Sequence, residues 1–144
     1  EQNKLIYQIN IENAKKGDEK AQYVIGYMYH KGKGVPKNYV KAADWYKKAA
    51  EHKNTKALNN LAYLYQKGKG VNKDIHKAEQ LLLKSAKQGD DVACLNLGIL
   101  YQTGKLGTAN MEDAEYWYRK AMDKGNPTAT RIYRRIQSME QKEN

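Results

Sequence analysis

The chain repeats itself with a period of 36 residues, and this repetition limits its possible folds more than any other feature. The clearest series of equivalent alanines, each 36 residues after the last, is Ala21, Ala57, Ala93 and Ala129. The same spacing relates Gly26, Ala62 and Gly98, and also Tyr29, Tyr65 and Tyr101. A period of this length is typical of stacked units that each bury their apolar face against a neighbour. We therefore predict a repeat array.

Each unit is predicted to be a helix, a glycine loop and a second helix. In the first unit Ala21, Ile25 and Tyr29 recur at the spacing that places side chains on one helical face. Gly32 and Gly34 then interrupt the helix, and a second periodic run follows. We expect an all-α fold in a single domain, 1–144, whose parts are an N-terminal cap helix (1–17), three repeats (18–53, 54–89 and 90–125) and a C-terminal cap helix (126–140).

These units resemble the Sel1-like repeat family, which is related to the tetratricopeptide repeat. The first copy carries the resemblance through Ala21, Ile25-Gly26, Tyr29, Gly32-Lys33-Gly34-Val35, Lys41-Ala42 and Ala49-Ala50. The second copy matches as closely, but the loop of the third reads Gly104-Lys105-Leu106-Gly107 and displaces the second glycine. The resemblance implies a right-handed α/α superhelical solenoid of three repeats with partial helical caps at both ends.

Chemical motifs are weak by comparison. The repeated Gly-Lys-Gly-Val follows a helix and lacks the Ser or Thr that a phosphate-binding P-loop requires, so we interpret its glycines as structural. Cys94 lies on a predicted buried face, and one cysteine allows no internal disulfide. His30, His52 and His76 share no spacing that suits two metal ligands. We expect no catalytic residue, no metal site and no cofactor.

The formal net charge of +10 favours an acidic partner. The lysines are spread along the chain without a nucleic-acid-binding fingerprint, so specific nucleic-acid binding is not expected. Binding to nucleic acid or to an anionic membrane through charge alone stays open. No apolar run approaches the ~20 residues of a transmembrane helix, so we predict no membrane span.

A second stripe on the first helix of each unit exceeds what core packing requires. By similarity to tetratricopeptide packing it lines the concave surface, where aromatic residues with a basic rim are typical of protein recognition. The alternative is that these side chains pack against the neighbouring helix. The predicted binding residues are Lys20, Tyr23, Tyr27, His30, Lys56, Asn59, Tyr63, Gln66, Lys67, Leu95, Ile99, Arg131 and Arg135.

The resemblance implies a non-enzymatic, monomeric module that binds a partner protein in its groove. One form of this function is a bacterial immunity protein that neutralises a cognate secreted effector or toxin, and a periplasmic or secreted location would suit it. A chain that opens on Glu1 agrees with a removed leader and equally with a trimmed chain. The alternative is a cytoplasmic adaptor or scaffold for signalling or secretion assemblies.

Overall fold

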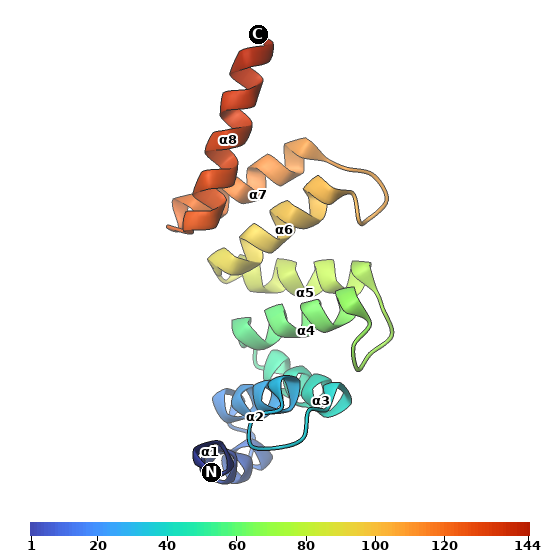
Figure 1. Ribbon diagram of the computed structural model, residues 1–144, viewed down its shortest axis with the longest axis vertical. Helices are drawn as coiled ribbons and strands as arrows, with labels where there is room; N and C mark the ends of the chain where they lie inside the picture. Colours follow the sequence, from blue (N-terminus) through green and yellow to red (C-terminus); the bar gives the residue numbers. More distant parts are fainter. The chain divides into compact units, whose positions relative to one another are not determined.

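The protein is all α-helical, as the sequence predicts. The computed structural model describes all 144 residues and contains eight helices (Figure 1). They form two compact units, Glu1–Leu81 and Leu82–Asn144, and the boundary falls inside one helix, α5 (Ile75–Lys87). The fold class is therefore that of an α/α repeat protein.

The first unit contains four complete helices and the start of α5. Its hairpin of α2 and α3 packs against α1 on one side and α4 on the other. The side chains of Ile25, Tyr46, Leu58 and Leu64 are completely or almost completely buried between these helices. The four complete helices are α1 (Gln2–Lys15), α2 (Glu19–Lys31), α3 (Tyr39–Glu51) and α4 (Thr55–Lys67).

The second unit contains the end of α5 and three further helices. They are α6 (Asp91–Thr103), α7 (Met111–Asp123) and α8 (Pro127–Glu143). The helix α7 packs against both α6 and α8, and its Tyr118 is a fully buried member of the core. The C-terminal helix continues to Glu143, three residues beyond the predicted cap helix.

The repeated Gly-Lys-Gly phrase shapes the backbone after the first helix of a unit. Gly68 ends α4 in the left-handed conformation, with φ of 67°, and its N–H bonds to the carbonyl of Leu64. Gly70 has φ of 73° and lies against the first turn of α3, where a side chain would overlap the carbonyl oxygen of Tyr39. Both glycines are thus structural, in agreement with our interpretation of the motif.

A tyrosine ring occupies the space that a missing side chain leaves on the neighbouring helix. A methyl group on Gly26 would lie 2.7 Å from Cδ1 of Tyr46, and one on Gly98 would lie 2.5 Å from Cδ1 of Tyr118. In the middle repeat the sequence changes both positions, to Ala62 and Leu82. The two substitutions compensate in size, because Ala62 is larger than glycine and Leu82 lacks the aromatic ring that packs against the glycine in the other repeats.

The first helix of each repeat and the C-terminal helix α8 begin at capping residues, and two of these caps have a second role. Asn54 accepts a hydrogen bond from the backbone N–H of Ala57, and its amide also donates to the carboxylate of Glu19 at 2.6 Å. Asn126 shows the same arrangement two repeats later, since it caps Ala129 and donates to Asp91 at 2.8 Å. Each of these two caps therefore starts its own helix and holds the start of an earlier one.

Candidate functional site

The predicted binding residues of the first unit lie on α2 and α4, which contact each other. Tyr63 is the most exposed of their tyrosines, at 39%, whereas Tyr23 and Tyr27 are partly buried. The stripe also includes three exposed lysines and two partly buried polar side chains. These five residues are Lys20, Lys56, Lys67, Asn59 and Gln66.

The three tyrosines are fixed by contacts that leave part of each ring accessible. The ring of Tyr23 stacks on the buried ring of Tyr46, with centroids 6.0 Å apart and planes at 27°. Tyr27 lies 6.2 Å from Tyr23, and Tyr63 stacks at 5.7 Å on the imidazole of His30. Rings that are already held in place lose little conformational freedom when a partner covers them.

Lysine side chains surround these rings. The ammonium of Lys33 lies 5.4 Å from the centroid of Tyr27, and that of Lys56 lies 5.9 Å from Tyr23. Lys69 lies 5.5 Å from the centroid of Tyr63 and donates a hydrogen bond of 3.3 Å to its hydroxyl. We call Tyr23, Tyr27 and Tyr63, with Lys33, Lys56 and Lys69, the tyrosine–lysine face.

The sequence prediction overlooked the loop lysines of this face. Lys33 and Lys69 are the middle residues of the two Gly-Lys-Gly phrases, which the sequence pattern indicates only as turns. The signal that could have found them is their position after helices that carry exposed tyrosines. Because each loop turns back beside its helix, its lysine reaches the rings of that helix.

His30 is a core residue, contrary to its predicted place on an exposed stripe. Its side chain is 7% exposed, and its Nδ1 lies 3.0 Å from the hydroxyl of Tyr46. Burial first, and then the charges of Lys31 and Lys69, lower the pKa of His30. A neutral imidazole packed among tyrosines stabilises the unit from within and presents little surface to a partner.

The other predicted binding residues belong to the second unit, where one packs against the core and the others are exposed. On α6, Ile99 is 36% exposed, whereas Leu95 packs against the core cluster of Ala114, Tyr118 and Ile136. On α8, Arg131 and Arg135 are exposed. Leu95 thus contributes to packing, while Ile99 and the two arginines are accessible.

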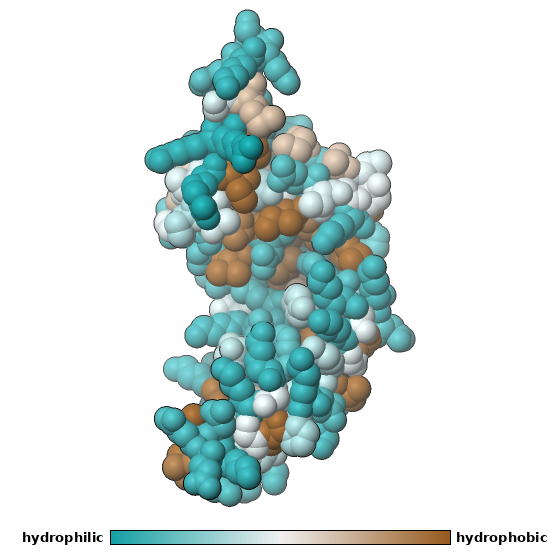
Figure 2. Space-filling model, in the orientation of Figure 1, coloured by the Kyte–Doolittle hydropathy of each residue, from teal (hydrophilic) through white to brown (hydrophobic).

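The positive charge of the first unit is concentrated in two segments of the sequence, each of which lies between acidic residues. Residues 20–43 contain five lysines and no acid, and residues 52–73 again contain five lysines and no acid. The ion pair found in the structure, Lys15 with Glu12, lies outside both segments. Figure 2 shows the hydropathy of one face of the molecule. On this face the first unit is mainly hydrophilic, whereas hydrophobic residues gather over α6.

Reactive side chains are buried or dispersed. Cys94 is fully buried, and burial raises the pKa of its thiol, which disfavours the nucleophilic thiolate. Ser85 is also fully buried. No group of three His, Cys, Asp or Glu residues is arranged to hold a metal ion. None of the eight helices combines the length and the apolar character that crossing a membrane requires.

Comparison with known proteins identifies the class of repeat. The Sel1 repeat model matches residues 19–54, 55–90 and 91–126, which together make up most of the chain. The chain therefore belongs to the Sel1 repeat family. Each matched repeat starts one residue after the start that the sequence predicts.

Several known proteins are similar to the chain. A Sel1 repeat protein from Oxalobacter formigenes is 36% identical, with a TM-score of 0.76 over 81% of this chain and 48% of that one. Cysteine rich protein B from Helicobacter pylori is 26% identical, with a TM-score of 0.72 over 90% and 96%. The chitin synthase regulator SKT5 from Saccharomyces cerevisiae is 40% identical over 53 residues, 37% of this chain and 8% of that protein. The chain thus spans about half of the Oxalobacter protein and a small part of SKT5.

Membership of this family has a general functional meaning. Sel1 repeat proteins mediate protein–protein interactions, and their fold is typically a non-catalytic interaction module. A fold supports many functions, so the particular partner must be inferred from the surface.

Proposed function

We propose that this protein binds an acidic partner protein through the tyrosine–lysine face of its first unit. The observation that carries the proposal is the combination of three accessible, well-held tyrosines with lysines that have no acid in their own segments. Tyrosine offers a large contact area at a low entropic cost and is enriched among the residues that dominate binding energy. The lysines would attract an acidic surface and orient it over the rings.

Substitution of both peripheral tyrosines tests this proposal directly. Tyr27→Ala with Tyr63→Ala should weaken capture of the native partner from host extract by at least about tenfold, because residues of this kind cost more than about 1 kcal/mol each when truncated. Tyr116→Ala is the matched control, since Tyr116 is 50% exposed on α7 and lies outside the face. Quantitative mass spectrometry of the captured proteins would measure the loss.

Stability measurements separate binding from packing. The double variant should lose only a few degrees in melting temperature, because Tyr27 contacts the partly buried Tyr23 and loss of Tyr63 uncovers one face of His30 without removing its contact with Tyr46. A large fall in melting temperature, or equal capture by the double variant and by Tyr116→Ala, would refute the proposed role of the face.

Salt dependence distinguishes the proposal from binding through charge alone. Binding to nucleic acid or to an anionic membrane should weaken steeply as salt is added. A tyrosine-centred protein interface should weaken less, because part of its energy comes from apolar contact. Loss of the captured partner between about 50 and 200 mM salt, by the factor of ~10³ that several phosphate contacts produce, would favour nucleic acid.

We further propose a dedicated partner, as for a bacterial immunity protein that neutralises a cognate toxic effector in the periplasm or after secretion. The family resemblance supports this finer assignment and predicts one tightly bound protein per monomer. The alternative is a cytoplasmic adaptor or scaffold, for which capture should recover several weakly bound proteins. The number and affinity of the captured proteins distinguish the two.

A further inference from the structure

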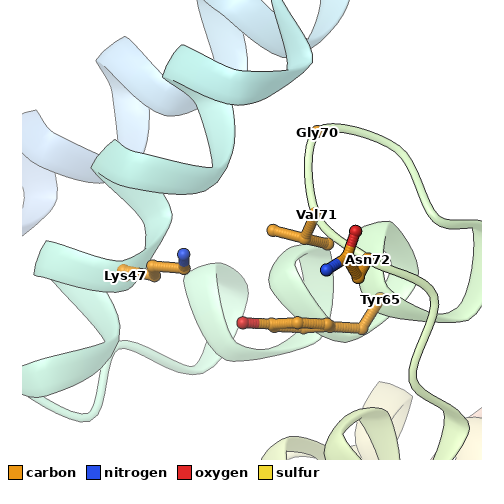
Figure 3. A pocket seen from close by; sticks show the side chains of 5 residues that line it. All are labelled: Lys47, Tyr65, Gly70, Val71 and Asn72. Atoms are coloured by element: carbon orange, nitrogen blue, oxygen red, sulfur yellow. The ribbon is translucent and has the colours of Figure 1, made fainter.

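The first unit contains a polar pocket that the proposed function does not use. It has a volume of about 610 Å³ and is lined by Lys47 of α3, Tyr65 of α4 and three loop residues, Gly70, Val71 and Asn72. Figure 3 shows the ammonium of Lys47 and the hydroxyl of Tyr65 directed toward the same space, with Asn72 on the loop beside it. The pocket therefore brings together three side chains that can donate hydrogen bonds.

The pocket lies where the middle repeat departs from the first. The residue equivalent to Tyr65 in the first repeat is Tyr29, whose hydroxyl lies 3.0 Å from that of Tyr7, with the two rings edge to face at 6.0 Å. The position 36 residues after Tyr7 is Ala43, which cannot fill the corresponding space or bond to Tyr65. The hydroxyl of Tyr65 therefore lacks the tyrosine partner that Tyr29 has, and Tyr65 lines the pocket.

The same comparison distinguishes Lys47. Its equivalents at the 36-residue spacing are Ile11 and Leu83, both apolar, and Arg119, which precedes the C-terminal helix. A position that accepts apolar residues in two other copies carries an ammonium group beside the open pocket. No acidic residue lines the pocket, so the positive charge of Lys47 has no counterion there.

We infer that this pocket binds a carboxylate, supplied by a Glu or Asp side chain of the partner polypeptide. A carboxylate accepts several hydrogen bonds, and bonds between charged groups are stronger than neutral ones. Lys47 would supply the charge, and Tyr65 and Asn72 would supply neutral donors. The inference rests on the proposed function for the source of the carboxylate, whereas the affinity of the pocket is a property of this chain alone.

The test uses the full chain and a small probe, so that it does not depend on the partner. N-acetylglutamate N-methylamide would be titrated at constant ionic strength while the backbone amide resonances are followed by NMR. Saturable shifts are expected at Gly70, Val71 and Asn72. The neutral glutamine analogue and inorganic phosphate are the comparison probes.

Two substitutions remove the proposed donors while keeping the size of the side chains. Lys47→Met should weaken carboxylate binding by about tenfold, and Tyr65→Phe by a few fold, as expected for loss of a charged and a neutral hydrogen-bond donor. Lys84→Met is the matched control, because Lys84 is exposed on α5 and has the same charge. The control should bind the probe as the original protein does.

Several results would overturn the inference. These are equal binding of the glutamine analogue, tighter binding of phosphate than of carboxylate, shifts spread over all the lysine-rich segments, and equal effects of Lys47→Met and Lys84→Met. If the pocket binds the carboxylate while the tyrosine variants still capture the partner normally, the proposed function fails and the pocket stands. If the probe does not bind while the tyrosine variants lose the partner, only the pocket fails.

Discussion

The contact between Gly26 and the ring of Tyr46 predicts that adding one methyl group will destabilise the first unit. Alanine is favoured over glycine inside a helix by about 1 kcal/mol, so an unobstructed Gly26→Ala change would be stabilising. Here the new methyl would lie 2.7 Å from Cδ1 and 2.8 Å from Cε1 of Tyr46. Overpacking a well-filled core costs about 1–3 kcal/mol.

The ring of Tyr46 has little freedom to move away. It is fully buried, and its hydroxyl is in contact with His30 at 3.0 Å and accepts a hydrogen bond from Asn60 at 3.3 Å. We therefore take an overpacking cost of about 2 kcal/mol, which exceeds the gain in helix propensity. The expected net effect is a loss of about 1 kcal/mol, or about 3 °C in melting temperature for a chain of this size.

A double-mutant cycle tests the reasoning beyond the sign of a single change. In the Tyr46→Leu background the pair becomes alanine with leucine, which is the combination at Ala62 and Leu82. Gly26→Ala should then stabilise by up to about 1 kcal/mol, so the coupling energy is about 2 kcal/mol. Urea unfolding followed by circular dichroism gives all four values. An effect of Gly26→Ala that is the same in both backgrounds would refute the steric argument.

Three further predictions concern other parts of the chain. Lys53 has φ of 62°, where Gly89 has φ of 90° at the equivalent position, so Lys53→Gly should raise the free energy of unfolding by about 0.5–1 kcal/mol, and Gly89→Lys should lower it in the same urea assay. A hydrogen bond with Glu140, assisted by burial, raises the pKa of Glu115 from 4.5 to about 7. Because the folded state holds this proton more tightly, the stabilisation is complete below pH 4.5 and is lost as the pH rises through 7. The melting temperature should therefore fall from pH 5 to pH 8 relative to that of Glu115→Gln. A constant difference between the two proteins over this range would contradict the shared proton. Iodoacetamide should modify Cys94 at least about a hundredfold more slowly in the native protein than in urea, as measured by mass spectrometry, and comparable rates would show that the thiol is accessible.

The period of 36 residues was sufficient to predict the alternation of helices and the structural role of the loop glycines. It identifies which residues share a helical face, but it does not give the depth to which each is buried. His30 illustrates the difference, because its position on the stripe suggested exposure while the rings of Tyr39, Tyr46 and Tyr63 surround it. Burial there depends on aromatic residues from three other positions, which no single-helix pattern describes.

The pocket at Lys47 shows a second limit of prediction from the repeat. A period is recognised from positions at which the copies agree, whereas this pocket arises where they differ, at Ala43 in place of Tyr7 and at Lys47 in place of Ile11. The differences are visible in the sequence. Their meaning depends on the fact that Tyr7 fills the space beside Tyr29, which is a three-dimensional contact.

The double role of Asn54 and Asn126 bears on how such a chain can lengthen. Each asparagine begins one helix and also holds the carboxylate at the first turn of the helix that precedes it by one repeat. No 36-residue unit carries both partners, because these two positions are Asp18 and Glu19, then Asn54 and Thr55, then Asp90 and Asp91. A tandem duplication of any one unit would therefore create a junction at which either the asparagine or the carboxylate is missing. Restoring the hydrogen bond between neighbouring units would then take at least one further substitution at the new junction.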